Sequence, residues 1–331
     1  MAMNRRIVLA SRPSGWVTPD NFRLETVPLP ALADGQLLVR NRWLSLDPYM
    51  RGRMNEGRSY AAAQPLNETM IGGTAGEVVD SRHPKFAVGE QVVGYLGWQE
   101  YGISDGSQLT KVDTRRVPLS AFLGPVGMPG VTAWIGLNRI IEPKADETIL
   151  VSAASGAVGS VVGQLARLGS CRAVGIAGGT EKCRYVTDEL KFDACIDYKA
   201  QDVGKALKEA APDGVDGYFE NVGGEIMDAV LPRMNAFGRI ALCGLIAGYN
   251  GAPIPIRNPS WFLVSRLKLQ GFIVSEFMPL WPQALKDLGE QVAAGSIKYR
   301  ESVAQGLENA PGAFVGMLKG ENFGKQLVRL D

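Results

Sequence analysis

The sequence of 331 residues predicts a two-domain α/β protein, in which an all-β domain precedes a doubly wound parallel sheet. Two observations lead to this prediction. Short strand-like runs separated by Gly, Pro and Asp fill the chain up to about residue 120, and helical patterns are scarce there. After residues 126–130, strand and helix patterns alternate, which is typical of a parallel sheet covered by helices.

In the first domain we expect strands at residues 37–46, 72–79 and 91–95. In the second domain we expect parallel strands near residues 148–152, 173–177, 194–197, 216–220, 239–243 and 268–274. An amphipathic helix follows at 282–295, and a strand-like run at 325–328 indicates that the tail returns to the first domain. The expected boundaries are therefore 1–125 with 297–331 for the first domain, and 126–296 for the second.

A tight turn of small residues links the first parallel strand to its helix. Ala154, Gly156 and Gly159 stand at the spacing of a dinucleotide-binding turn, with alanine in place of the first glycine. Such a turn is sharp, approaches a bound phosphate closely and lets the helix pack against the strand. A helix starting near Ala157 would direct its N-terminal N–H groups at the anion. The alternative is a structural turn in an Ala-rich segment. The expected phosphate contacts are Ser155, Gly156, Ala157, Val158 and Gly159.

The end of the second parallel strand indicates which dinucleotide binds. An NAD enzyme places Asp or Glu about 20 residues after the glycine turn, where it binds the ribose 2′-hydroxyl. This sequence has Gly178 and Gly179 there, so no carboxylate would repel a 2′-phosphate, and Lys182 follows within reach. Glu181 is a weaker opposing signal, and a solvated helix lysine is the alternative for Lys182. We therefore expect NADP(H) rather than NAD(H), with Gly178 and Lys182 as contacts.

Charge and hydrophobicity exclude several kinds of partner. Lys and Arg number 35 against 34 Asp and Glu, with no long run of one sign, so neither nucleic acid nor an anionic membrane is an expected partner. No apolar stretch approaches the roughly 18 residues that span a bilayer. The apolar run near the start is also too short for the core of a signal peptide. We therefore expect a cytoplasmic protein.

Metal chemistry is also disfavoured by the sequence. The four cysteines include no C-x-x-C pair, and His83 is the only histidine, so a zinc site is hard to assemble. We expect no metal site. The cysteines are expected to be buried apolar residues in a reducing compartment: Cys171, Cys183, Cys195 and Cys243.

Two other catalytic patterns are weak. Residues 102–106 match G-x-S-x-G, but the strand, helix and downstream histidine that a hydrolase needs are missing or doubtful, so the match predicts a turn. None of the nine tyrosines is followed by lysine at Tyr-x-x-x-Lys spacing. Neither a hydrolase nor a short-chain dehydrogenase is expected.

Six motifs occur in one order along nearly the whole chain: residues 47–51 (DPYMR), 127–133 (GMPGVTA), 153–159 (AASGAVG), 220–224 (ENVGG), 238–240 (GRI) and 317–325 (MLKGENFGK). Together they resemble the zinc-free medium-chain reductases, specifically the leukotriene B4 dehydrogenase or prostaglandin reductase group. That group includes plant alkenal double-bond reductases and bacterial curcumin reductase. The resemblance implies a Rossmann domain and a GroES-like all-β domain. Zinc-dependent relatives carry Gly-His-Glu near residues 71–73 and a cysteine near 44–47, which this sequence lacks.

The resemblance implies transfer of a hydride from NADPH to the β carbon of an α,β-unsaturated ketone or aldehyde, followed by protonation of the enolate. Such a reaction needs aligned carbons and a donor at the enolate oxygen. By similarity, Tyr249 hydrogen-bonds that oxygen or relays the proton, and Tyr49 lines the substrate cleft. The alternatives are an exposed loop tyrosine at 249 and a packing aromatic at 49. A quinone oxidoreductase on this scaffold and an NADPH-binding protein without turnover also stay open.

The resemblance further assigns cofactor contacts along the chain. Lys182 and Tyr198 match ligands of the 2′-phosphate, and Asn221 matches a position near the ribose. Asn322 matches a contact made from the other domain. The remaining expected contacts end the fifth strand, border the nicotinamide or form a hinge between the domains: Cys243 and Gly244; Phe272, Ile273 and Val274; Met128, Pro129, Gly130 and Thr132. The alternating strand 266–273 resembles the edge that joins two subunits, so a homodimer is expected.

Overall fold

The computed structural model describes residues 2–251 and 253–331. The chain divides into two compact units: residues 1–123 with 301–331, called the first unit, and residues 124–300, called the second unit. These limits lie two residues before the expected boundary at 125 and four residues after the one at 297. Each unit has its own sheet.

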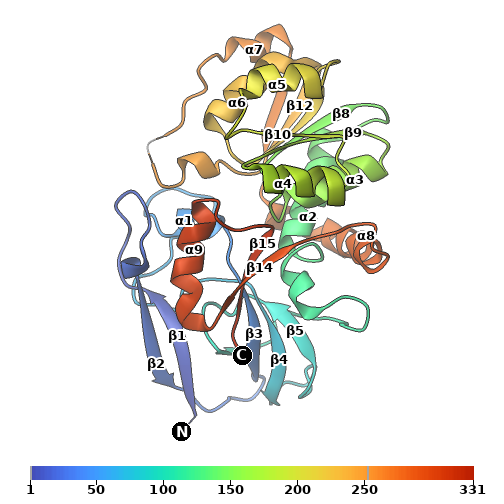
Figure 1. Cartoon of the computed structure of the whole chain (residues 1–331). Coiled ribbons are helices and arrows are strands. Elements are labelled where there is room, and N and C mark those ends of the chain that lie inside the picture. The colour runs from blue at the N-terminus through green and yellow to red at the C-terminus, as the bar shows by residue number, and fades with distance from the viewer. Residues whose placement is uncertain (1, 252) are drawn as a thin grey trace. The chain divides into compact units, whose positions relative to one another are not determined.

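The second unit contains a six-stranded parallel sheet in the order β10-β9-β8-β11-β12-β13, which confirms the predicted doubly wound fold (Figure 1). The chain runs outward from β8 in one direction and from β11 in the other. Because parallel crossovers are right-handed, the helices of the two halves cover opposite faces. The strands are β8 (Thr148–Ser152), β9 (Arg172–Ala177), β10 (Ala194–Asp197), β11 (Val215–Glu220), β12 (Met234–Leu242) and β13 (Lys268–Gly271).

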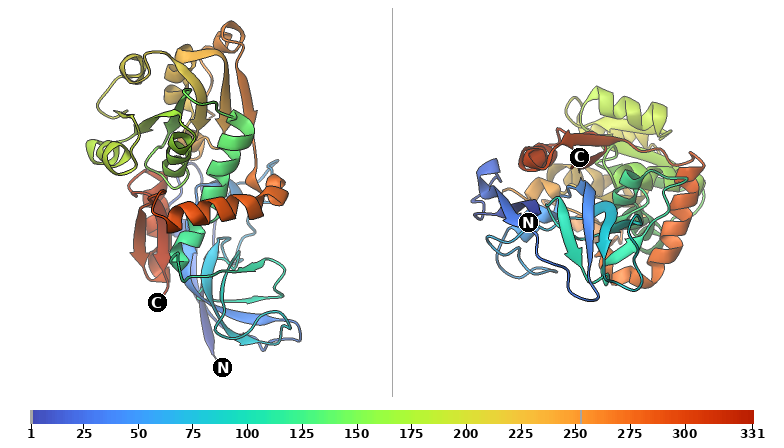
Figure 2. Two further views of the ribbon diagram at one scale, coloured as in Figure 1. Left: turned by 90° about the vertical axis from the view of Figure 1, so that its right-hand side faces the viewer. Right: turned by 90° about the horizontal axis from the view of Figure 1, so that it is seen from below.

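Helices cover this sheet and bury its apolar side chains. One face carries a core in which Leu150 and Ile240 of the sheet meet Leu207 and Val230 of two helices. A long helix packs against the first helix of the unit, where Trp134 Nε1 donates to Asp287 Oδ2 at 3.1 Å (Figure 2). The helices are α2 (Met128–Ile135), α3 (Gly159–Leu168), α4 (Thr180–Arg184), α5 (Val203–Ala210), α6 (Gly224–Val230), α7 (Ser260–Val264) and α8 (Trp281–Ala293).

The fifth and sixth parallel strands differ from the prediction. β12 begins at Met234, five residues before the expected start at 239, and its register on β11 shifts between Val215 and Gly217. Within the irregular stretch, Phe237 has a φ of 65°, a left-handed conformation that resembles a turn in sequence. β13 ends at Gly271, three residues before the expected end at 274.

The first unit is built mainly from antiparallel strands around an aromatic core. Phe22 stacks on Trp98 with ring centroids 5.2 Å apart, and Phe314 meets both rings edge-on. A two-stranded sheet pairs β1 (Met3–Leu9) with β2 (Phe22–Pro28). The main sheet has the order β14-β15-β3-β4-β5-β7, and β6 also pairs with β3. Its strands are β3 (Leu37–Ser45), β4 (Thr74–Ser81), β5 (Gln91–Gly94), β6 (Tyr101–Ser104), β7 (Leu109–Lys111), β14 (Glu301–Gln305) and β15 (Lys325–Arg329). Its helices are α1 (Tyr49–Arg53) and α9 (Ala310–Leu318).

The C-terminal tail belongs to the sheet of the first unit. β15 pairs antiparallel with β3, with Leu327 opposite Ser45. At the same place, Lys325 Nζ lies 2.9 Å from Asp47 Oδ1 and donates to the Leu46 carbonyl at 2.7 Å, and both ionic side chains are buried. Removing one partner of such a buried ion pair strongly destabilises the fold, because the other charge stays buried without compensation. The pair therefore fastens the tail to the loop that precedes α1.

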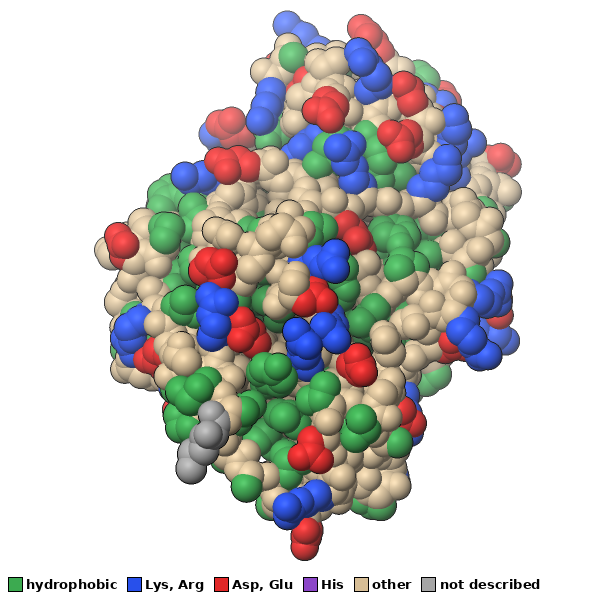
Figure 3. All heavy atoms as spheres, turned by 60° about the horizontal axis from the view of Figure 1, so that its bottom comes forward, with side chains coloured by type: hydrophobic (Ala, Val, Ile, Leu, Met, Phe, Trp, Pro, Cys, Tyr) green, Lys and Arg blue, Asp and Glu red, His purple; other side chains and the backbone are tan. Residues whose placement is uncertain are grey.

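Charges of both signs are interspersed on the face drawn in Figure 3, in keeping with the near balance of the composition. Among the described residues, none of the helices is both long and apolar enough to cross a bilayer.

Candidate functional site

The carboxyl ends of the six parallel strands bring together most of the residues that the sequence predicted as cofactor contacts. Ligands of doubly wound sheets bind at this edge, where the strand order reverses, and here the reversal lies between β8 and β11. Each predicted group follows a different strand: Ser155 to Gly159 after β8, Gly178 after β9, Tyr198 after β10, Asn221 after β11, Cys243 and Gly244 after β12, and Phe272 to Val274 after β13.

The turn after β8 is closed by backbone geometry. Ala153 has a φ of 50°, and its carbonyl accepts a hydrogen bond from the Gly156 N–H at 2.9 Å. A Cβ at Gly159 would lie 2.4 Å from the Ala153 oxygen, so the close approach of helix and strand requires glycine. α3 begins at Gly159, two residues after the predicted start near Ala157, because residues 153–158 form the turn. Its ten residues leave N-terminal N–H groups at the carboxyl edge of the sheet.

A buried carboxylate, whose role the sequence did not reveal, joins β8 to β11 at the reversal. Glu220 is fully buried, and its Oε1 accepts from Ser152 Oγ and from the Val222 N–H, both at 2.6 Å. Its Oε2 accepts from Tyr218 Oη at 2.6 Å. Ser152 also accepts from the Asn221 N–H at 2.8 Å, and Asn221 Nδ2 donates to the Ser152 carbonyl at 2.8 Å. The network holds the position of Asn221 beside the glycine turn.

Tyr249 follows β12 and the short 3-10 segment Ile246–Gly248, and its hydroxyl lies against the loop that leaves the strand. The hydroxyl accepts from the Leu245 N–H at 3.4 Å, and a Cβ at Gly244 would lie 3.3 Å from both Tyr249 Oη and the Asn221 carbonyl. The ring is half-buried. These contacts place the phenol beside Gly244 and Asn221, so the alternative of an exposed loop tyrosine does not describe it. Beside it, burial raises the pKa of the Cys243 thiol to about 12.

The end of β9 carries a positively charged corner. The Tyr198 ring lies over Gly178, where an added Cβ would come within 2.8 Å of the ring. Burial, followed by the positive charge of Lys199, lowers the pKa of Lys182. Two lysines that repel each other are stabilised by a bound anion. Lys199 was not among the predicted contacts, because no motif marks it, and only the fold brings it near Lys182.

The carboxylate of Asp197 orders the same corner. It is buried at the end of β10, and its Oδ1 accepts from the Gly179 N–H at 2.8 Å and from the Lys199 N–H at 3.1 Å. These bonds connect the loop after β9 to the loop after β10. Asp197 therefore fixes the backbone next to Gly178 and at Lys199.

The four predicted hinge residues all lie in α2 of the second unit. A Cβ at Gly130 would lie 1.8 Å from the Pro125 carbonyl oxygen, so this position requires glycine. The Thr132 hydroxyl donates to the Met128 carbonyl at 2.8 Å, and Pro129 is buried in the first turn of the helix. The segment is therefore a well-packed helix start within one unit.

The residues predicted next to the nicotinamide follow β13. Phe272 is buried, and its ring meets Phe219 and Phe277 edge-on at 6.2 and 6.5 Å. Ile273 has an extended backbone, and Val274 starts a 3-10 segment. This aromatic cluster packs against Gly136, where a Cβ would lie 2.4 Å from Phe219. The carboxyl edge of the sheet is therefore apolar next to β13.

Tyr49 and Asn322 belong to the first unit. The Tyr49 hydroxyl is buried and has no hydrogen-bond partner among the described residues. Burial, followed by the charge of Asp47, raises the pKa of Tyr49 above its usual value. A buried hydroxyl without a protein partner is a feature that a ligand can satisfy. Asn322 Nδ2 donates to the Gly324 carbonyl at 2.9 Å, which leaves its side-chain oxygen as an acceptor.

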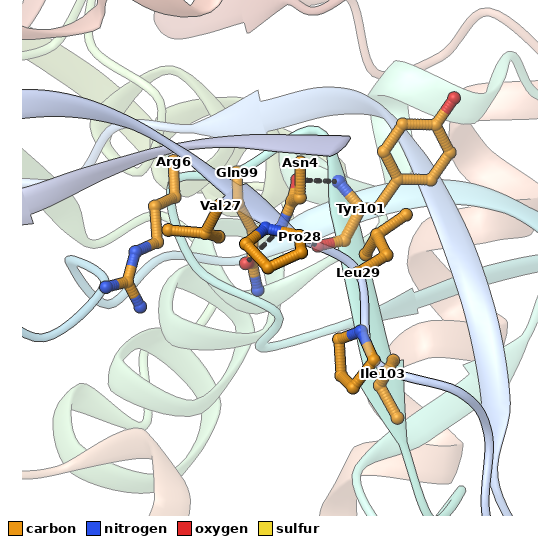
Figure 4. Close-up of a pocket in the computed structure, with 9 residues that line it drawn as sticks. Asn4, Arg6, Val27, Pro28, Leu29, Gln99, Tyr101 and Ile103 are labelled. Atoms are coloured by element: carbon orange, nitrogen blue, oxygen red, sulfur yellow. Dashed lines mark hydrogen bonds between the residues drawn. The ribbon is translucent and has the colours of Figure 1, made fainter. Parts of the chain in front are cut away.

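A separate concavity on the first unit contains none of the predicted site residues. Figure 4 shows Asn4 between Gln99 and Tyr101, to which it is hydrogen-bonded. The walls also include Val27 and Ile103. Because the polar groups at its floor already bond to one another, this concavity is an ordinary surface groove.

Comparison with known proteins places this geometry in a family. Residues 5–112 match the family described as N-terminal domain of oxidoreductase, and residues 157–290 match the zinc-binding dehydrogenase family. The residues do not fit a zinc ion. No group of three or more His, Cys, Asp and Glu side chains that could hold a metal occurs in the described ranges 2–251 and 253–331.

Individual relatives match the chain from end to end. It is 47% identical to the NADPH-dependent curcumin reductase of Escherichia coli (strain K12), over 99% of this chain and 97% of the relative. It is 40% identical to the 2-alkenal reductase (NADP(+)-dependent) of Nicotiana tabacum, over 98% and 97% of the two chains. The crystal structure of CurA in complex with NADPH from Vibrio vulnificus superposes with a TM-score of 0.94, at 47% identity and 99% coverage of both chains. The chain therefore belongs to the medium-chain dehydrogenase/reductase family, in the group of the curcumin, 2-alkenal and prostaglandin reductases.

Proposed function

We propose that this protein is an NADPH-dependent reductase of the carbon–carbon double bond of α,β-unsaturated ketones and aldehydes. The observation that carries the proposal is the row of groups at the carboxyl edge of the parallel sheet. A phosphate-binding turn follows β8, a pair of lysines follows β9 and β10, and a phenol follows β12. The names of the relatives, which are reductases of curcumin and of 2-alkenals, point to the same substrate class.

Different groups along this edge would bind the different parts of NADP(H). The turn at Ser155 to Gly159 and the start of α3 would hold the pyrophosphate, because its N–H groups favour an anion. Lys182 and Lys199, with Tyr198 over Gly178, would hold the 2′-phosphate. Asn221 would hold the ribose, and the apolar cluster around Phe272 would border the nicotinamide. When bound, NADPH supplies the hydride that adds to the β carbon of the substrate.

Tyr249 would stabilise the negative charge that develops on the substrate oxygen. Its hydroxyl accepts a hydrogen bond from the Leu245 N–H at 3.4 Å. A phenol O–H can donate a hydrogen bond as well as accept one. A donor aimed at an oxygen that becomes an enolate lowers the barrier more than one aimed at the ground-state carbonyl.

Tyr49 would recognise the substrate from the first unit. Its hydroxyl is kept protonated by burial and lacks a partner among the described residues, so it is available to a carbonyl oxygen. The buried Asp47–Lys325 pair holds the backbone just before α1 and thereby orients the ring. Asn322 would add a contact to the cofactor from the same unit.

The experiment that tests this function compares substrates and coenzymes in one assay. Oxidation of NADPH is followed with a series of enones, enals and quinones, and the enone series is repeated with NADH. We expect turnover with enones or enals and a clear preference for NADPH. Turnover with quinones alone would instead assign a quinone oxidoreductase, and binding of NADPH without turnover of either class would leave only a binding protein.

We further propose a cytoplasmic homodimer. The dimer is supported by an edge strand and by the exposed apolar side chains that precede it. β13 ends the strand order of the parallel sheet, and Leu263 and Val264, just before it, are 80% and 56% exposed. A second copy of this chain would cover these side chains and extend the sheet. Light scattering of the purified protein at several concentrations tests the dimer, and a monomer at all of them would refute it.

A further inference from the structure

Two of the four cysteines meet next to the corner proposed for the 2′-phosphate. Cys183 lies in α4 and Cys195 in β10, and their sulfur atoms are 3.1 Å apart, with the Cys195 thiol donating to the Cys183 sulfur. Both are free thiols and, like Cys243, both are half-buried, although the sequence predicted that all four cysteines are buried. Cys171, by contrast, is buried and donates to the Lys144 carbonyl.

The fold brings these sulfurs together through two backbone features. β10 is the outermost strand beside β9, so Cys195 stands at an edge of the sheet below α4. The facing residue on β9 is Gly175, where an added Cβ would lie 3.4 Å from the Cys195 sulfur. An added Cβ there would also lie 2.8 Å from Ala154 Cβ and 3.0 Å from Val186 Cγ1, so Cys195 packs beside a position at which only glycine fits. A disulfide has an S–S distance of about 2.05 Å, so roughly 1 Å of movement would form the bond.

The two thiols also differ in reactivity. The hydrogen bond from the Cys195 thiol lowers the pKa of Cys183, against the opposing effect of burial. The same hydrogen bond and burial raise the pKa of Cys195. The thiolate is the nucleophile in sulfur chemistry, so Cys183 would react first and Cys195 would resolve the product.

We propose that Cys183 and Cys195 form a peroxide-sensitive dithiol, which closes to a disulfide and weakens the binding of NADP(H) at the adjacent phosphate corner. The coupling to the coenzyme rests on the function proposed above. Lys182 precedes Cys183 in α4, and Tyr198 follows Cys195 by three residues. Drawing the two sulfurs together moves the backbone on which both phosphate contacts stand.

The oxidation balances with a peroxide as the only added reactant. The Cys183 thiolate attacks one peroxide oxygen, the O–O bond breaks, hydroxide leaves, and Cys183 becomes a sulfenic acid. The Cys195 sulfur then attacks the Cys183 sulfur, the S–O bond breaks, water leaves with the Cys195 proton, and the S–S bond forms. The hydroxide takes up the proton released when Cys183 ionised. Two thiols are oxidised, one peroxide is reduced, and two waters form.

The test treats the whole protein with hydrogen peroxide and measures the linkage and the coenzyme affinity separately. Mass spectrometry of the digested protein should show a peptide pair joined through Cys183 and Cys195, with two hydrogens lost. The Kd for NADPH, measured by fluorescence, should rise about tenfold, which corresponds to about 1.4 kcal/mol. The Kd for NADH should change little, and a reducing dithiol should reverse the effect.

Three variants control this experiment. Cys183→Ser and Cys195→Ser should each abolish the linkage and the change in affinity, whereas Cys171→Ser should respond like the unmodified protein. Peroxide treatment that yields no Cys183–Cys195 bond would overturn the proposal, and so would a bond that leaves the NADPH affinity unchanged. Failure of the reduced protein to bind NADPH at all would refute the proposed function instead, and the linkage would then be judged by mass spectrometry alone.

Discussion

The two glycines of the turn after β8 should fail in different ways when each is replaced by alanine. A Cβ at Gly159 would lie 2.4 Å from the Ala153 oxygen and 3.0 Å from Ala154 Cα, and both are rigid backbone atoms. A Cβ at Gly156 would meet only the Ala153 oxygen, at 3.1 Å. Gly159→Ala must therefore separate helix from strand, whereas Gly156→Ala fits with a small adjustment but covers the surface that a pyrophosphate would approach.

The magnitudes follow from these contacts. Overpacking in a core costs about 1–3 kcal/mol. For a unit that spans the 177 residues 124–300, each kcal/mol lowers Tm by about 2–4 °C. Gly159→Ala should thus lower Tm by roughly 2–12 °C. Gly156→Ala should leave Tm within about 2 °C but raise the Kd for NADPH at least roughly tenfold.

Thermal unfolding monitored by circular dichroism and NADPH titration by fluorescence separate the two effects. The measurements are made on both variants and on the unmodified protein at one pH and salt concentration. Equal losses of stability in the two variants would refute the geometric reasoning. Unchanged NADPH affinity in Gly156→Ala would remove the turn from the phosphate site.

Other predictions concern single side chains. Lys182→Ala removes a charge-assisted hydrogen bond worth about 1.5–3 kcal/mol. The Kd for NADPH should therefore rise roughly 10–150-fold, and the Kd for NADH should not change. An equal loss of affinity for both coenzymes would contradict the assignment. Because the pKa of Lys182 is lowered, the amine loses its charge at a lower pH than an ordinary lysine, and NADPH affinity should fall as pH rises into the alkaline range while NADH affinity stays level in the same titration. Tyr249→Phe should reduce kcat roughly 10²–10³-fold with little change in NADPH Kd, and unchanged steady-state turnover would exclude the phenol from its role. Lys325→Met leaves Asp47 buried without its partner and should cost about 3–5 kcal/mol in urea unfolding, and a cost near zero would show that the pair does not fasten the tail.

The elements with strong local patterns could be predicted from sequence. β8 and β10 run from Thr148 to Ser152 and from Ala194 to Asp197, as expected, because short apolar runs bounded by turn residues are typical of parallel strands. The start of β12 could not be found in the same way. Its bulge contains Phe237 in a left-handed conformation, and a glycine follows, so the segment resembles a turn in sequence.

The parts of the site that were missed depend on contacts between distant segments. In the sequence, Glu220 is only one residue of the motif at 220–224, because its bond to Ser152 across the strand reversal exists only in the folded sheet. Lys199 and the Cys183–Cys195 contact arise because β10 returns beside α4. Spacing along the chain carries no signal for such pairs. Residues whose role depends on local backbone, such as Gly159, were accessible from sequence because their constraint is local.

The central claim is that this protein adds a hydride to the β carbon of an enone. The most direct test incubates the protein with an enone and NADPH that carries deuterium at the transferable position of the nicotinamide, and locates the deuterium in the product by NMR. We expect a saturated ketone with deuterium at the β carbon. An allylic alcohol with deuterium on the former carbonyl carbon, or a product without deuterium, would contradict it.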